Sequence, residues 1–322
     1  MDIYEDVNIN PFGVNVLSLF DGMCCGMIAM KSAGLDVANY DAYEIDKYAI
    51  KTAKHNFPLI REHGDVFNAD FTKYNNIDFL IGGSVCTYWS IAQTKNRETV
   101  ASGIGWDLFC QYVRALNEVK PRYFIYENNH SMSDAIRDSI NQTFGFEAVM
   151  INSNLVSAQS RRRLYWVGKL NIDGTYSKIE VKQPDDAGII LSDVIENAFA
   201  MRDKSHAIIG SIGRTTYREY FIKNQGELAA IPVGDGAIDF NNQAIYNVYD
   251  GQITVKGIQY PVPLANGKYF LRKITINECK RLQTVPEWYE FPVSKTQAYK
   301  MLGNGWTCEV IAHLIKSCIN SD

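Results

Sequence analysis

Short apolar runs of strand length alternate with helical patterns in the first half of the chain. The runs are residues 14–20, 39–45, 77–81 and 123–126. Helical patterns lie between them, at residues 23–33, 46–56 and 106–119. Continuous apolar strands that alternate with helices predict an α/β fold, with a mostly parallel sheet covered by helices on both faces. Because ligands bind at the carboxyl ends of such strands, the residues that follow each run are the candidate site residues.

The alternation ends near residue 170, and the rest of the chain follows a different pattern. Residues 200–270 are rich in turns and alternate only loosely, which predicts a small irregular β-rich domain. Helical patterns return at residues 275–282 and 306–317. We therefore predict a first domain at residues 1–190, a second domain at 191–271 and a C-terminal segment at 272–322 that returns to the first.

Composition excludes several classes of protein. No apolar stretch of about 18 residues occurs, so no membrane span is predicted, and the acidic start MDIYEDVNINPFG is not a secretory signal. Seven cysteines without a CxxC pair predict no zinc or other metal site and a reducing compartment. The net charge is −4, but residues 201–300 hold 13 Lys and Arg against 9 Asp and Glu. A basic face of this kind is compatible with a nucleic-acid partner.

Polar and glycine residues follow the first three strand patterns. Phe20-Asp21-Gly22 with Gly26 joins a strand to a helix, where glycine lets the backbone approach a negative group. Glu44 closes the next strand, where a carboxylate can accept both hydroxyls of a ribose, and Asp65 can accept from an adenine amino group. Alone, each residue also fits a steric glycine or a helix cap. Together they favour a nucleoside cofactor with an amino-acid end, such as S-adenosylmethionine.

A cysteine and an acid follow two later strands. Cys86 lies in the glycine-led loop GGSVCTYWS, from which a thiolate can reach a substrate, although a lone cysteine is more often a small buried hydrophobe. Glu127 ends the strand pattern 123–126, so its carboxyl belongs at the same sheet edge. Arg161 and Arg163 follow in QSRRR and point the same way if extended, or form a solvated basic cluster.

The order of these motifs resembles that of the C5-cytosine DNA methyltransferases, especially the phage and mobile-element members. The series is FDGxxxG, Glu44, Asp65, GGSxC, ENx, QxRxR and GNGW at 303–306. The resemblance covers residues 14–318 apart from a variable stretch between 170 and 270. It implies an S-adenosylmethionine-binding catalytic domain at 1–190 and a target-recognition domain at 191–271.

The resemblance also implies a cofactor pocket and its product, S-adenosylhomocysteine. Phe20 would pack on the adenine, Glu44 would hold the ribose and Asp65 the adenine amino group. Asn304, returning from the C-terminal segment, would close the pocket. The implied cofactor-binding residues are Phe20, Asp21, Gly22, Met23, Cys25, Gly26, Glu44, Ile45, Asp65, Val66, Leu108, Asn304 and Gly305.

The chemistry implied for the substrate explains the catalytic residue types. The Cys86 thiolate would attack C6 of cytosine, Glu127 would hold N3, and the activated C5 would take the methyl group. Arg163 would hold the cytosine O2 and Arg161 would favour the thiolate. The cytosine must first be flipped out of the duplex, at a cost of a few kcal/mol. Residues 93–105 are the candidate for a loop that closes over DNA, or are a plain surface loop.

Two departures from the family pattern leave alternatives open. Val85 replaces the usual proline before the nucleophile, and Asn129 replaces the valine of ENV. The chain could therefore be a catalytically impaired DNA-binding paralogue. It could also be a C5 transferase with an altered substrate, such as RNA, or an altered transferred group. The Cys-Phe-Thr element of the tRNA-acting branch is absent from the sequence, so DNA is preferred.

The expected partner is double-stranded DNA, contacted mainly by the target-recognition domain. The candidate contacts are Ser90, Gln159, Arg214, Arg218, Lys223, Lys256 and Lys268. For each of the five basic residues, an exposed solubilising charge is the more common role. We further expect a monomer in the cytoplasm of a bacterium or a phage-infected cell. It would either protect DNA or act beside a cognate restriction endonuclease in a restriction–modification system.

Overall fold

The computed structural model describes residues 12–84, 86–91, 97–234 and 244–321, and for Cys86 it describes the backbone only. The chain forms two compact units. The first comprises the described residues up to Asn152, Arg162–Pro184 and those from Cys308 onward. The second comprises Ser153–Arg161 and the described part of Asp185–Thr307. Each unit is treated by itself below.

The first unit is built on one twisted sheet with the strand order β3-β2-β1-β4-β5-β8-β6, and β9 pairs with β8. Strands β1 to β5 run parallel, whereas β8 is antiparallel to β5, β6 and β9. This arrangement confirms the predicted α/β fold. The strands are β1 Val14–Leu19, β2 Val37–Tyr43, β3 Arg61–Glu62, β4 Phe79–Gly82, β5 Tyr123–Asn129, β6 Val149–Asn152, β8 Arg162–Leu170 and β9 Tyr176–Lys178.

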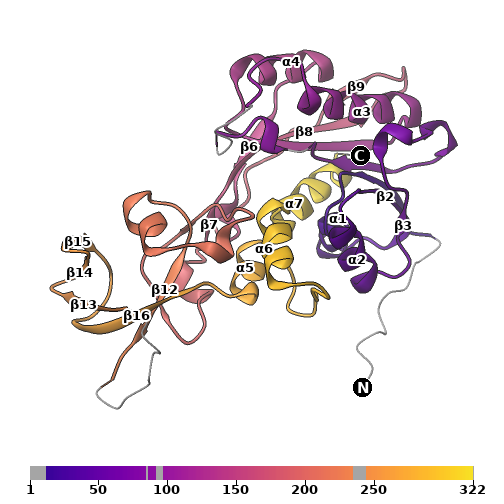
Figure 1. Cartoon of the computed structure of the whole chain (residues 1–322). Coiled ribbons are helices and arrows are strands. Elements are labelled where there is room, and N and C mark those ends of the chain that lie inside the picture. The colour runs from indigo at the N-terminus through magenta and orange to yellow at the C-terminus, as the bar shows by residue number, and fades with distance from the viewer. Residues whose placement is uncertain (1–11, 85, 92–96, 235–243, 322) are drawn as a thin grey trace. The chain divides into compact units, whose positions relative to one another are not determined.

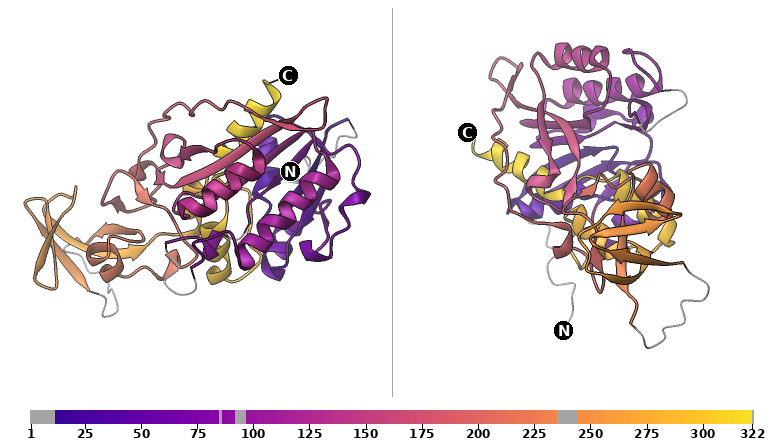
Figure 2. Two further views of the ribbon diagram at one scale, coloured as in Figure 1. Left: turned by 90° about the horizontal axis from the view of Figure 1, so that it is seen from above. Right: turned by 90° about the vertical axis from the view of Figure 1, so that its left-hand side faces the viewer.

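Helices cover both faces of this sheet (Figures 1 and 2). α3 and α4 lie on one face, and α1, α2 and α7 lie on the other. The α-helices are α1 Cys25–Ser32, α2 Lys47–Asn56, α3 Ile104–Val119, α4 Asp134–Phe144 and α7 Cys308–Ile319. Three short 3-10 turns are η1 Val66–Asn68, η2 Phe71–Lys73 and η3 Cys86–Tyr88. In the described ranges, no helix is both long and apolar enough to cross a membrane.

An aromatic core fixes α3 and α4 on the strands that lead to the candidate catalytic residues. Phe109 of α3 contacts Tyr126 of β5, with ring centroids 5.2 Å apart, and meets Phe144 of α4 edge-on at 5.6 Å. Tyr112 packs on Tyr126 at 4.9 Å. Aromatic pairs at these separations add stabilisation beyond the area they bury. The carboxyl end of β5 therefore rests on a rigid layer.

The second unit contains an antiparallel sheet and a helical part. Its six-stranded sheet has the order β10-β12-β16-β13-β14-β15, and a separate parallel pair joins β7 to β11. The strands are β7 Gln159–Ser160, β10 Phe199–Ala200, β11 Ser205–His206, β12 Leu228–Pro232, β13 Ile245–Tyr249, β14 Gln252–Val255, β15 Ile258–Pro261 and β16 Gly267–Lys273. The helices are η4 Ser153–Leu155, η5 Leu191–Asp193, η6 Ile212–Arg214, η7 Arg218–Ile222, α5 Ile276–Leu282 and α6 Lys295–Asn304.

Two features differ from the sequence expectation. β5 does not end at Tyr126, because β8 continues to pair with it as far as Asn129, opposite Arg163. Glu127 therefore lies inside the strand instead of after it. The residues expected to be irregular form a regular antiparallel sheet, and of the C-terminal helices only α7 belongs to the first unit. The predicted functional ranges 1–190, 191–271 and 272–322 stay a prediction.

Candidate active site

The turn between β1 and α1 is held by a carboxylate from the end of β2. Phe20, Gly22 and Cys24 all have positive φ, so the backbone folds tightly here. Glu44 accepts the Gly22 amide through Oε2 at 2.8 Å. Its Oε1 accepts the next two backbone amides of its own segment at 2.7 and 2.8 Å. The structure thus brings Phe20, Gly22 and Glu44, three of the predicted cofactor residues, to one corner of the sheet.

Asp21 lies buried beneath this turn. Its Oδ1 accepts from Ser18 Oγ and from Tyr40 OH, both at 2.6 Å, whereas Oδ2 has no hydrogen-bond partner among the described residues. Burial raises the pKa of Asp21 to about 6, against the opposing effect of the Ser18 and Tyr40 hydrogen bonds. An unsatisfied buried carboxylate oxygen at this turn fits a positively charged ligand group, such as an ammonium.

A second carboxyl with buried oxygens lies nearby on β3. Neither oxygen of Glu62 has a hydrogen-bond partner among the described residues. Burial, followed by the negative charges of Asp21 and Glu44, raises the pKa of Glu62 to about 8. The environment of the turn is therefore strongly acidic, which also favours a cationic ligand. Sequence reasoning missed Glu62, because the residue gives no motif signal.

The wall of the same region is apolar. Val66 belongs to the buried core cluster of the first unit, and Phe20 and Leu108 pack against that cluster while remaining partly exposed. Asp65 caps η1 by accepting the Phe67 amide at 3.0 Å. These predicted residues fit a nucleobase, since they combine an apolar surface with a carboxylate at its edge. Of the other predicted positions, Met23 before α1 and Cys25 and Gly26 within α1 are buried, and Ile45 is exposed.

The loop that carries Cys86 lies against the end of β5. η3 begins at Cys86, whereas Val85 and the Cys86 side chain lie outside the described part. A Cβ added to Gly83 would lie only 2.7 Å from Glu127 Oε2, so a glycine is required for this close approach. The next residue, Ser84, shares a 2.6 Å hydrogen bond with Tyr126 OH. The Glu127 carboxylate therefore lies beside this loop at Gly83, which is three residues before Cys86.

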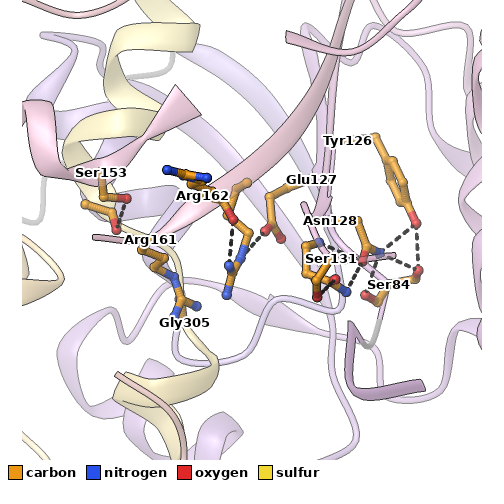
Figure 3. A network of polar contacts seen from close by, with 12 residues as sticks. Ser84, Tyr126, Glu127, Asn128, Ser131, Ser153, Arg161, Arg162 and Gly305 are labelled. Atoms are coloured by element: carbon orange, nitrogen blue, oxygen red, sulfur yellow. Dashed lines mark hydrogen bonds and ion pairs between the residues drawn. The ribbon is translucent and has the colours of Figure 1, made fainter. Parts of the chain in front are cut away.

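Glu127 forms an ion pair with Arg163. Arg163 Nε lies 3.0 Å from Glu127 Oε1, and the two side chains are 16% and 9% exposed. The register of β5 on β8 sets this distance, because Arg163 pairs opposite Asn129, two residues beyond Glu127. Figure 3 shows Glu127 together with the hydrogen bonds of the neighbouring residues Ser84, Asn128 and Ser131. The structure thus brings Glu127 and Arg163 together.

Arg161 has its contacts within the second unit. Its guanidinium is buried and donates to the carbonyls of Ile208 at 3.0 Å and Gly305 at 2.9 Å. A longer bond of 3.3 Å reaches the Gly303 carbonyl. Arg161 therefore supports the GNGW segment, in which Asn304 is exposed at the end of α6. The roles of Arg161 toward the thiolate and of Asn304 toward the cofactor stay predictions.

The predicted DNA contacts divide into exposed and buried residues. All five basic residues are exposed on the second unit: Arg214, Arg218, Lys223, Lys256 and Lys268. Gln159, in contrast, is fully buried. Its amide donates to the Leu282 carbonyl at 2.7 Å and accepts from the Ile208 amide at 2.9 Å. The structure gives Gln159 a packing role within its unit. Ser90 is half-buried in the first unit.

Comparison with known sequences gives the family. The sequence model described as C-5 cytosine-specific DNA methylase matches residues 14–320. The chain is 32% identical over 167 residues to an orphan methyltransferase of Bacillus phage rho11s, covering 48% of this chain and 33% of that protein. It is 30% identical over 283 residues to a type II methyltransferase of Lactococcus lactis subsp. cremoris, covering 81% and 67% respectively. The match thus spans about a third of the phage relative.

Comparison with solved structures supports the same fold. The structure of a methyltransferase from Entamoeba histolytica superposes with a TM-score of 0.63, at 13% sequence identity, over 96% of this chain and 98% of that chain. At this identity the match shows the fold alone. The family model covers nearly all of the chain and confirms the resemblance read from its motifs, so the chain belongs to the C-5 cytosine-specific DNA methylase family.

Proposed function

We propose that the protein transfers a methyl group from S-adenosylmethionine to C5 of a cytosine in duplex DNA. The observation that carries the proposal is the position of the Glu127 carboxylate, which lies on Gly83 in the loop of Cys86 and is paired with Arg163. A nucleophile and an acid brought close together by neighbouring strands are what addition to a pyrimidine ring requires. Membership of the family supports the same reaction.

The cofactor would occupy the corner formed by the β1–α1 turn, Glu44 and Asp65. When bound, S-adenosylmethionine supplies an electrophilic methyl group and becomes S-adenosylhomocysteine. Phe20, Val66 and Leu108 offer an apolar surface to the adenine, and Glu44 offers its carboxylate to the ribose hydroxyls. Oδ2 of Asp21, which has no hydrogen-bond partner within the described part of the chain, offers an acceptor to a cationic group. Glu44 must then exchange part of its bonding with backbone amides for the ribose.

The chain's own residues would activate the cytosine. The Cys86 thiolate adds to C6, which places electron density at C5. Glu127 donates a proton or a hydrogen bond to N3 and thereby stabilises the adduct, while Arg163 orients Glu127 and binds O2. After C5 has taken the methyl group, a base such as water removes the C5 proton. The thiolate then leaves C6, and the aromatic ring is restored.

The second unit would recognise the DNA. Its exposed basic side chains, including Lys256 beside Tyr217 at 5.1 Å from the ring centroid, suit contacts with phosphate and base edges. The cytosine has to leave the stacked duplex to reach Cys86, since C6 is not accessible within the helix. We infer that the protein acts as a monomer on the DNA of a bacterium or its phage, with a cognate restriction endonuclease as a possible partner.

A direct assay tests the transfer. The protein is incubated with labelled S-adenosylmethionine and mixed-sequence duplex DNA, and the nucleosides are analysed by mass spectrometry. The wild type should produce 5-methylcytosine, and Cys86→Ala should lower the rate by roughly 10³-fold or more. Cys110→Ala is the matched control, because Cys110 is an exposed cysteine of α3 outside the site. The control should keep wild-type activity.

The same assay separates the alternatives that Val85 and Asn129 leave open. A DNA-binding paralogue without activity would bind duplex DNA without cofactor and form no covalent complex with 5-fluorocytosine DNA. A transferase with another substrate or group would yield a modified nucleoside of different mass, or a product in RNA only. Either result would contradict methylation of DNA cytosine.

A further inference from the structure

The chain that leaves the nucleophile turn η3 is fastened by one partly buried carboxylate, that of Glu98. Glu98 Oε2 accepts from the indole Nε1 of Trp89 at 2.9 Å, and Oε1 accepts the backbone amide of Gly105 at 3.1 Å. The Glu98 amide itself donates to the Tyr88 carbonyl, the last residue of η3, at 2.9 Å. One residue therefore connects η3, the residue that follows η3, and the first turn of α3.

Glu98 supplies the acceptor for two N–H groups that need one, the indole N–H of Trp89 and the backbone amide of Gly105. Trp89 is 0% exposed, so its indole N–H needs an acceptor inside the protein. The Gly105 amide belongs to the first turn of α3, where backbone N–H groups have no acceptor within the helix and negative charge is favoured. A carboxylate satisfies both because it has two acceptor oxygens and no donor.

Two glycines leave the room that this carboxylate occupies. A Cβ on Gly103 would lie 2.6 Å from Glu98 Oε1, and a Cβ on Gly105 would lie 2.5 Å from Oε2. Both distances are shorter than any ordinary carbon–oxygen contact. The sequence SGIG at 102–105 thus matches the position of Glu98 and fixes it at the start of α3.

A second tie holds the same chain to the end of β5. Arg97 donates to the Ser131 carbonyl at 2.7 Å and to the Trp89 carbonyl at 3.2 Å. Ser131 Oγ donates to Asn129 Oδ1 at 2.8 Å and accepts the Ile91 amide at 3.3 Å. Asn129, the departure from the family's ENV pattern, therefore contributes its amide oxygen to this tie. The second tie therefore reaches β5 at Asn129, two residues beyond Glu127.

We propose that Glu98 is a positioning residue for Cys86. It fixes η3 against the start of α3 and so sets where the nucleophile lies relative to Glu127 on β5. The assignment rests on the proposed function, in which Cys86 must reach C6 while Glu127 reaches N3. Because attack requires the reacting atoms within about 3–3.5 Å, a displacement of about 1 Å costs on the order of 100-fold in rate.

The test compares three variants with the wild type. Glu98→Ala removes both acceptors, Glu98→Gln keeps the shape and one acceptor oxygen, and Glu180→Gln removes an exposed carboxylate of the first unit as control. The readout is the single-turnover rate of covalent complex formation on mixed-sequence duplex DNA containing 5-fluorocytosine, with S-adenosylmethionine present. Dissociation constants for the cofactor and for DNA, and the Tm, are measured on the same samples.

The expected result is a loss in rate without a loss in binding. Glu98→Ala should lower the rate roughly 10- to 100-fold, Glu98→Gln should fall between it and the wild type, and Glu180→Gln should match the wild type. Both dissociation constants should change less than about 2-fold, since ground-state binding is not involved. If Glu98→Ala does not fold, the Gln variant decides, because it conserves the volume.

Three outcomes overturn the assignment, and they are distinguishable. A wild-type rate in the Glu98 variants, with an active wild type, would contradict the positioning role alone. Equal losses in rate, cofactor binding and DNA binding, with a lowered Tm, would show a general structural role instead. If the wild type itself forms no covalent complex, both the proposed function and this assignment fail.

Discussion

The β1–α1 turn, where we propose that the cofactor binds, and the segment around the nucleophile turn η3 are each held by a glutamate carboxylate. The two glutamates come from different kinds of structure. In each case a carboxylate accepts a backbone amide: Glu44 accepts that of Gly22 in the β1–α1 turn, and Glu98 accepts that of Gly105 in the first turn of α3. Glu44 lies directly after the neighbouring strand, whereas Glu98 lies within an irregular segment. The first turn is therefore fixed by the regular βαβ pattern, and the second by side chains particular to this chain.

The largest expected effect separates chemistry from cofactor binding. Glu127→Gln removes the acid at N3 and should lower kcat by about 10²- to 10⁴-fold. The dissociation constant of the cofactor should stay nearly unchanged, because Glu127 contacts the Cys86 loop and not the β1–α1 turn. Steady-state methylation and calorimetric titration measure the two quantities. Glu118→Gln is the control, since Glu118 is also an Arg-paired carboxylate of the first unit but is exposed. A matching loss of cofactor affinity would contradict this separation.

The complementary change acts on the cofactor turn. Glu44→Ala removes the acceptor of the Gly22 amide and the predicted ribose ligand, and should weaken cofactor binding roughly 10-fold, about 1.4 kcal/mol. The rate of methyl transfer at saturating cofactor should change much less. Titration of S-adenosylhomocysteine into the variant measures the first quantity, and single-turnover methylation the second. An unchanged dissociation constant would remove Glu44 from the cofactor site.

A smaller effect is expected from the second unit. Lys256→Ala and Lys268→Ala, at exposed positions, should each weaken DNA binding a few-fold and lower the salt slope of log K by about 1 if the lysine contacts phosphate. Fluorescence anisotropy at several salt concentrations gives this slope. Lys73→Ala, an exposed lysine of the first unit, should leave it unchanged. Identical slopes for all three variants would argue against this face as the DNA contact.

The smallest effect concerns stability near the cofactor turn. The pKa of Glu62 rises from 4.5 to about 8, so the folded state binds more protons than the unfolded state between these values. Its contribution to stability therefore falls as pH rises from about 4.5 to about 8 and then stays constant. Glu62→Gln should raise Tm by a few degrees at pH 8 and by less at pH 5. A pH-independent shift in calorimetry, relative to Glu180→Gln, would contradict the raised pKa.

Much of the cofactor side could be predicted from the sequence because its contacts are local. The apolar runs correspond to β1, β2, β4 and β5 within a few residues. The helical pattern expected at residues 46–56 corresponds to α2, which Asp46 caps by accepting the Tyr48 amide at 2.9 Å. Such features depend on neighbours in the chain and on the period of the pattern, which a single sequence displays.

The nucleophile side could be predicted only in part. The motifs identified Cys86, Glu127 and Arg163, but not the antiparallel β8 that extends β5 and sets the distance between Glu127 and Arg163. Nor did they identify Glu98 or Ser131, whose partners lie up to 40 residues away along the chain. The only available signal was the adjacent charged pair Arg97-Glu98 a few residues after Trp89. In a sequence, such a pair cannot be distinguished from solvated loop residues.

The path of the chain restricts how the second unit can be exchanged between relatives. The backbone passes from one compact unit to the other at residues 152–153, 161–162, 184–185 and 307–308. The second unit is therefore not a single cassette: Gln159 and Ser160 of β7 pair with Ser205 and His206 of β11, which come from the other segment. If recombination replaces residues 185–307 with the corresponding segment of a relative, the new segment must preserve this strand pairing. Otherwise residues 153–161 must be replaced together with it.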